Sequence, residues 1–112
     1  MGVLGRLRVA KEHRAFYCPG CEEYHMVRVS GPQGAWGFNG DHDNPTFTPS
    51  VLVTGYERLT DEEYARVLRK EEVERRPLVC HSFVTDGRIQ FLNDCTHRLA
   101  GQTLELPDLD DL

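Results

Sequence analysis

The segment that most constrains the fold is FYCPGCEEYH, residues 16–25, in which Cys18 and Cys21 are separated by two residues. A Cys-x-x-Cys pair is typical of a metal knuckle, a redox couple or a disulfide. Intracellular thiols stay reduced, which favours metal binding over a disulfide. A thioredoxin-like couple needs a βαβ context, whereas strand-like segments flank this motif. Metal binding is therefore the preferred interpretation, and free structural thiols and a redox pair or disulfide are the alternatives.

The intracellular setting is inferred from what the sequence lacks. The start MGVLGRLRVA has no apolar core or cleavage site of a signal peptide. No apolar run approaches the ~20 residues of a membrane-spanning helix. The formal net charge of −5 argues against general affinity for nucleic acid, which depends on phosphate neutralisation. We expect a soluble cytoplasmic protein with no membrane or nucleic-acid partner.

The predicted fold is mainly β (α+β): a small, zinc-ribbon-like antiparallel sheet domain with one surface helix. The 112 residues suit a single zinc-binding domain, in which a metal would compensate for a small core. A helix is predicted over 59–72, with Thr60 as its N-cap and Glu63 completing a capping box. Asp86-Gly87 between apolar alternations predicts a hairpin. Segment 39–50 is predicted as an ordered loop and 107–112 as a frayed acidic tail. Strands are predicted over 4–9, 24–30, 35–38, 51–54, 78–84, 88–92 and 102–106.

Two more cysteines, Cys80 and Cys95, flank the predicted hairpin. In the register of a two-residue turn, Cys80 lies opposite Asn93 and becomes a diagonal neighbour of Cys95, ~7 Å away. Four thiolates can bind Zn²⁺ tetrahedrally. Three cysteines and a histidine would satisfy zinc equally well. The predicted Zn²⁺ ligands are Cys18, Cys21, Cys80 and Cys95, with His97 or His25 as alternates.

A second polar centre is expected on the opposite face of the hairpin. Strand alternation turns His81 away from Cys80, and Asp94 falls on the side of His81. The polar loop 39–46 contains a proline that fixes its path, and it has few apolar residues to bury. The alternative is that Asx turns and turn caps occupy these polar side chains. The candidate catalytic or binding residues are Asn39, Asp41, His81 and Asp94.

Three segments resemble a known family: FYCPGCEEYH, WGFNGDHDNPTFTPSVLV and CHSFVTDGRIQFLNDCTHRLAGQTLELP. The family comprises small, uncharacterised proteins of tailed phages and prophages, and the resemblance covers residues 16–107. It implies that helix 59–72 is an insertion. The "ammonia monooxygenase" label of many members gains no support from a chain without an expected membrane helix. Relatives near bacterial ubiquitin-like conjugation genes imply a zinc-bearing adaptor. The matching motif residues are Cys18, Cys21, His25, Trp36, Asn39, Gly40, Asp41, Pro45, Thr46, Pro49, Ser50, Cys80, His81, Asp94, Cys95 and His97.

Three functions remain open at this point. The preferred one is a non-enzymatic zinc-binding module of a phage-type protein, which contacts another protein of host or phage. The second is a zinc-dependent hydrolase with His81, Asp94 or Asp41 as its general base. A thiolate-rich site argues against this hydrolase, because thiolates make zinc a poor Lewis acid. The third is a virion or decoration component.

Overall fold

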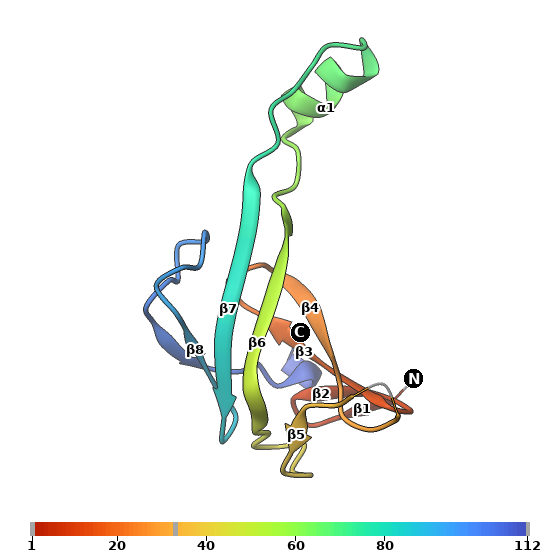
Figure 1. Cartoon of the computed structure of the whole chain (residues 1–112), viewed down its shortest axis with the longest axis vertical. Helices are drawn as coiled ribbons and strands as arrows, with labels where there is room; N and C mark the ends of the chain where they lie inside the picture. The colour runs from red at the N-terminus through yellow and green to blue at the C-terminus, as the bar shows by residue number, and fades with distance from the viewer. Residues whose placement is uncertain (1, 33, 112) are drawn as a thin grey trace.

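The computed structural model describes residues 2–32 and 34–111, and it consists of two antiparallel sheets and a projecting helix (Figure 1). The mainly β fold with one helix is therefore confirmed. The first sheet has the order β1 (Gly2–Leu4), β2 (Leu7–Ala10), β3 (His13–Cys18) and β4 (Glu23–Arg28). The second sheet has the order β5 (Gly37–Phe38), β6 (Phe47–Tyr56), β7 (Pro77–Thr85), β8 (Arg88–Phe91) and β9 (Thr103–Glu105).

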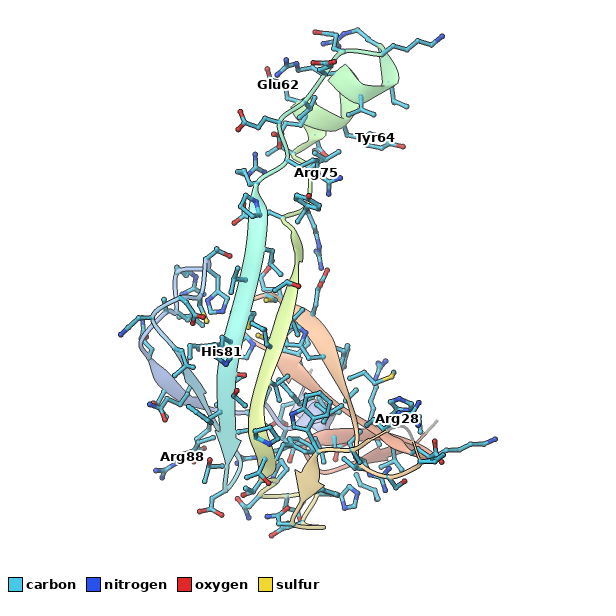
Figure 2. All side chains as sticks on the ribbon, viewed as in Figure 1. Arg28, Glu62, Tyr64, Arg75, His81 and Arg88 are labelled. Carbon is cyan, nitrogen blue, oxygen red and sulfur yellow. The ribbon has the colours of Figure 1, made fainter. Side chains whose placement is uncertain are left out.

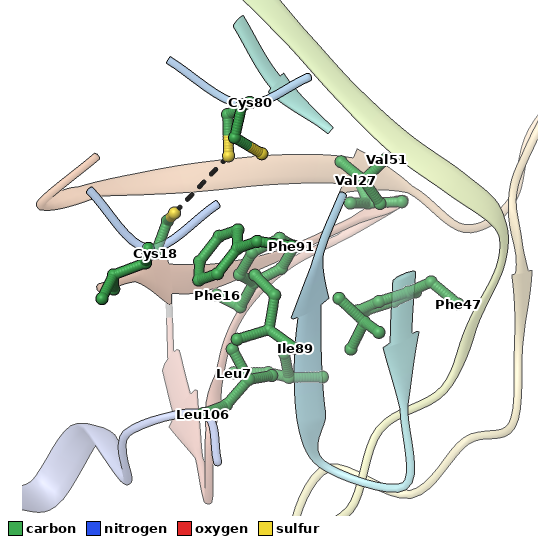
Figure 3. Close-up of a cluster of buried hydrophobic side chains, with 13 residues drawn as sticks. Leu7, Phe16, Cys18, Val27, Phe47, Val51, Cys80, Ile89, Phe91 and Leu106 are labelled. Carbon is green, nitrogen blue, oxygen red and sulfur yellow. Dashed lines mark hydrogen bonds between the residues drawn. The ribbon is translucent and has the colours of Figure 1, made fainter. Parts of the chain in front are cut away.

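The hydrophobic core lies between the two sheets (Figure 3). Phe16 on β3 stacks on Phe47 on β6, with ring centroids 6.2 Å apart. Ile89 and Phe91 on β8 are buried, while the residues that alternate with them are exposed. This period of two is the pattern of a strand with one buried face.

The β7–β8 hairpin has the predicted turn. Asp86 and Gly87 have φ of 50° and 77°, and two positive φ values in a two-residue loop match the right-handed twist of the strands. Thr85 pairs with Arg88 across the turn. This register places His81 and Cys80 on opposite faces of β7.

Strands β6 and β7 extend beyond the core and carry helix α1 (Asp61–Leu68) at their tip (Figure 1). The predicted capping box is confirmed: Glu63 N–H donates to Thr60 Oγ1 at 3.1 Å, and Thr60 N–H donates to Glu63 Oε1 at 2.9 Å. The helix is shorter than predicted, and Lys70 beyond its end has a φ of 62°. None of the helix residues is buried. Tertiary packing therefore contributes little to this helix, and its caps and ion pairs hold it.

Other predicted boundaries were wrong. The expected strand 4–9 is divided between β1 and β2 by a turn at Gly5, where φ is 57°. The expected loop 39–50 already becomes strand β6 at Phe47. The expected frayed tail is ordered as far as the 3₁₀ helix η1 (Leu109–Asp111), because Leu109 is buried and its N–H donates to Gly5 O at 3.1 Å. The end of that tail, Leu112, lies outside the described residues.

Between residues 2 and 111, leaving aside position 33, no helix has both the length and the apolar character needed to cross a membrane.

Candidate active site and metal centre

Ser50, His81 and Asp94 form a hydrogen-bonded chain. His81 Nε2 lies 2.9 Å from Ser50 Oγ, and His81 Nδ1 lies 3.1 Å from Asp94 Oδ2. An ionised carboxylate only accepts hydrogen bonds, so this network assigns the imidazole proton to Nδ1. Nε2 is then a free acceptor for the Ser50 hydroxyl. This is the arrangement of nucleophile, base and orienting acid in serine hydrolases.

Each of the three side chains comes from a different structural element. His81 lies in the middle of β7, opposite Leu52 on β6. Asp94 lies in the turn that follows β8. The contact between His81 and Asp94 was expected from strand parity, and Figure 2 shows His81 halfway along β7.

Ser50 reaches His81 because β6 has an irregular register. Phe47 pairs with Val84 and Val51 with Ser82, so three residues of β6 between these pairs face one residue of β7. Pro49 lies in this bulge, where the missing N–H of proline interrupts no ladder. Bulges re-aim side chains, and this one directs Ser50 Oγ onto the imidazole. Trp36 Nε1 donates to Ser50 O at 3.1 Å and anchors the bulge.

The triad lies on the open outer face of the second sheet. The side chains of His81 and Asp94 are 26% and 54% exposed. Two large apolar residues beside them, Leu52 and Phe83, are also exposed. The surface around His81 is therefore accessible to solvent, and water can reach Asp94.

Asn39 and Asp41 do not join this centre. Asn39 Oδ1 accepts the N–H groups of Asp41 and Thr46, each at 3.1 Å. Asp41 Oδ1 accepts the N–H groups of Asp43 and Asn44 at 2.9 and 3.0 Å. The expected four-residue cluster was wrong in these two members, because the backbone of their own loop satisfies the side chains. The alternative of an Asx-turn network fits the structure.

A possible metal-binding group lies on the inner side of β7. The ligand atoms of Cys18, Cys21, His25 and Cys80 all lie within 4.8 Å of one another. Cys18 and Cys80 are buried with their sulfur atoms 3.8 Å apart (Figure 3). His25 is 5% exposed, and its Nε2 is buried without a hydrogen-bond partner. Three thiols and a buried imidazole form a donor set that suits a metal ion.

The thiols in this group titrate very differently. A hydrogen bond from Cys80 lowers the pKa of Cys18 to about 4, and the same contact raises the pKa of Cys80. Burial raises the pKa of Cys21 to about 12. One thiolate therefore forms readily, and mutual repulsion opposes the others. A bound cation would remove this repulsion and favour the fully ionised group.

A second group contains Cys80, Cys95 and His97. His97 Nδ1 accepts the N–H of Leu99 at 3.2 Å, so neutral His97 carries its proton on Nε2, which lies 3.5 Å from Cys80 Sγ. In this tautomer Nε2 donates to sulfur and has no lone pair for a metal ion. Gly20 makes room for this ring, since a Cβ there would lie 2.3 Å from His97 Cε1.

The metal group therefore differs from the predicted set in its fourth member. The structure places His25, an alternate, with Cys18, Cys21 and Cys80, whereas Cys95 belongs to the second group. The alternation of the strand placed Cys95 near Cys80. It did not show that His25, four residues after Cys21, lies beside Cys80. Metal binding by any of these residues stays a prediction.

Residues 4–92 match the model of a protein family described as "Bacterial ubiquitination-like system serine protease (BubE)". The chain belongs to this family. The match contains Ser50 and His81 and ends two residues before Asp94. No curated protein and no solved structure matches the chain.

The family match corrects two expectations. The resemblance to an uncharacterised phage family was wrong, because the matching family belongs to a bacterial ubiquitination-like system. The preferred function, a non-enzymatic phage module, was also wrong, because the family is described as a protease. The hydrolase alternative agrees better with this finding.

Sequence reasoning missed the contact of Ser50 with His81, since Ser50 appeared only as a motif residue of the resemblance. Its surroundings, FTPSV, contain no nucleophile motif such as Gly-x-Ser-x-Gly. No local signal could have found it, because its partner His81 lies 31 positions further along the chain.

Proposed function

We propose that the protein is a serine peptidase in which Ser50 is the nucleophile, His81 the general base and Asp94 the orienting acid. The observation that carries this proposal is the pair of hydrogen bonds that His81 makes, 2.9 Å to Ser50 Oγ and 3.1 Å to Asp94 Oδ2. The family description as a serine protease supports the same chemistry.

The reaction follows from the positions of these atoms. Ser50 Oγ attacks the substrate carbonyl carbon while His81 Nε2 takes the hydroxyl proton. Asp94 stabilises the resulting imidazolium through Nδ1–H. His81 then gives the proton to the leaving amine, and an acyl-Ser50 ester remains. Water attacks this ester with His81 again as the base, which releases the acid and restores Ser50.

The substrate class in this proposal is a protein. The triad lies on an exposed strand surface, which an extended polypeptide can reach. The family is described as part of a ubiquitination-like system, and we propose that the protein acts on the peptide or isopeptide bonds of such a system. The expected partner is accordingly another protein, the substrate itself.

We also propose that the four-residue metal group binds Zn²⁺ and that the ion has a structural role. Four protein ligands leave no open position for water, which is typical of structural zinc. The ligands are Cys18, Cys21, Cys80 and His25, whose orphaned Nε2 fits an additional partner. Both ring nitrogens of His81 are engaged by Ser50 and Asp94, which argues against His81 as the base of a zinc-dependent hydrolase.

A fluorophosphonate probe tests the nucleophile without knowledge of the natural substrate. We expect covalent labelling of the purified protein at Ser50, identified by mass spectrometry, and loss of labelling in Ser50→Ala. Ser30→Ala is the matched control, because Ser30 is exposed and the hydroxyl hydrogen-bonded to His81 is that of Ser50. Equal labelling of the Ser50→Ala variant, or no labelling of a folded protein, would refute the proposal.

A further inference from the structure

Cys95 is a buried cysteine that makes two contacts with the backbone of His81. Its sulfur accepts the N–H of His81 at 3.3 Å and donates to the C=O of His81 at 3.2 Å. Its exposed fraction is 8%. Cys95 directly follows Asp94, so these contacts join the orienting acid to the general base.

The donated hydrogen bond distinguishes Cys95 from the metal group. Only a protonated thiol can donate to a carbonyl oxygen, whereas a cysteine that binds metal is a thiolate. Cys95 also lies outside the group formed by Cys18, Cys21, His25 and Cys80. The structure therefore gives Cys95 a role as a hydrogen-bonding side chain.

The next residue repeats the same type of contact. Thr96 Oγ1 accepts the N–H of Val79 at 3.1 Å, and Thr96 N–H donates to Val79 O at 2.9 Å. Beyond the end of β8, side chains thus continue the hydrogen bonding along β7. Beside His81, the turn that carries Asp94 is held by the Cys95 thiol and by Leu92 N–H, which donates to His81 O at 2.9 Å. Thr96 holds it beside Val79.

The position of the Asp94 carboxylate depends on this turn, because the side chain makes few contacts of its own. Its side chain is 54% exposed, and among residues 2–32 and 34–111 its one hydrogen-bond partner is His81. The position of its carboxylate is therefore determined by the backbone of the turn. A displacement of this turn would lengthen the 3.1 Å contact to Nδ1.

We propose that Cys95 is a positioning residue for the triad, whose thiol holds the Asp94 carboxylate against His81 Nδ1–H. The inference rests on the proposed function and deepens it. Without the thiol, the turn moves, Nδ1–H loses its acceptor, and the imidazole no longer presents Nε2 to Ser50. Removal of the thiol therefore lowers the reactivity of Ser50, while probe binding and the metal group stay unchanged.

Two variants test this role. Cys95→Ala removes both hydrogen bonds, whereas Cys95→Ser keeps a donor and an acceptor at the same place. We expect the maximal rate of fluorophosphonate inactivation to fall by ~10²-fold in Cys95→Ala, as for a misplacement of about 1 Å, with an unchanged half-saturating concentration. Cys95→Ser should recover most of the rate. Both variants should keep the zinc content of the parent protein.

Proton NMR gives a readout that does not depend on activity. The Nδ1–H proton of His81, hydrogen-bonded to a carboxylate, should give a downfield resonance in the parent protein and in Cys95→Ser, and this resonance should be absent from Cys95→Ala. Absence of the resonance from Asp94→Asn would assign it to this Nδ1–H proton. If the parent protein shows the resonance but is not labelled, the peptidase is refuted. Loss of the resonance in Cys95→Ala and its retention in Cys95→Ser would then still support the positioning role.

Three outcomes would overturn the positioning role. The first is a Cys95→Ala variant with the resonance and inactivation rate of the parent protein. The second is loss of zinc in that variant, which would make Cys95 a ligand. The third is a Cys95→Ser variant as impaired as Cys95→Ala. If Cys95→Ala does not fold, Cys95→Ser alone tests the role. Retention of the inactivation rate and of the His81 resonance in Cys95→Ser supports the role, and loss of both contradicts it.

Discussion

Cys80 and His81 are neighbours on β7 whose side chains point to opposite faces of the sheet. Cys80 Sγ lies 3.8 Å from Cys18 Sγ inside the core, and His81 Nε2 lies 2.9 Å from Ser50 Oγ on the outer face. One step along a strand therefore separates the metal group from the triad.

Removal of the metal is expected to unfold the protein. Structural zinc contributes ~10–16 kcal/mol of binding free energy that is coupled to folding. A typical domain has a net stability of only ~5–15 kcal/mol. A chelator or Cys18→Ser should therefore abolish the cooperative thermal melt and the labelling of Ser50. Elemental analysis of untreated protein should give one zinc per chain, and a metal-free, fully folded protein would contradict this prediction.

His25 and His97 should respond differently to substitution. His25→Ala removes a proposed ligand and should release the metal. His97→Ala removes an N–H that faces Cys80 Sγ at 3.5 Å and should weaken metal binding without abolishing it. Cobalt substitution followed by visible spectroscopy can measure both effects. If His97→Ala lost the metal and His25→Ala kept it, His97 would be the ligand.

Asp94 should matter more than Asp41 for reactivity. Asp94→Asn removes the acceptor that fixes the His81 tautomer and should slow labelling of Ser50. Because Asp94 is half exposed and screened by water, we expect a loss smaller than the roughly 10⁴-fold effect of a buried triad aspartate. Asp41→Ala is the control, and its labelling rate should equal that of the parent protein. An equal effect of both variants would restore the originally expected four-residue centre.

The attachment of α1 should weaken in acid. Hydrogen bonds from Arg76 and from the Thr60 backbone lower the pKa of Glu63 from 4.5 to about 2. A depressed folded-state pKa stabilises the folded state above the unfolded pKa, and this stabilisation is lost as the pH falls through the folded value. The protection factors of the α1 amides, which correct for the intrinsic pH dependence of exchange, should therefore fall between pH 4.5 and about 2.

Glu63→Gln provides the control for this acid transition. It should lower the protection factors at pH 5 and remove most of their pH dependence, because the amide cannot form the 2.7 Å ion pair with Arg76. An unchanged exchange profile in Glu63→Gln would show that the ion pair does not hold the helix.

Several features of this protein follow from sequence alone because they depend on neighbouring residues. Thr60 and Glu63 are close enough in the chain to cap a helix turn, and Asp86-Gly87 tolerates the positive φ values of its turn. Strand parity then places Cys80 inward and His81 outward, toward Asp94. Such short-range geometry predicted the hairpin, the capped helix and the contact between His81 and Asp94.

The tertiary structure alone decided which hydroxyl meets His81 and which residue completes the possible metal-binding group. Ser50 meets His81 through a bulge in β6 that periodicity does not predict, and Trp36 holds that bulge from another segment. His25 joins Cys80 because the first sheet packs its buried face against the second. Contacts between distant segments depend on how the sheets pack and where the register shifts, and one strand's alternation carries no information about either.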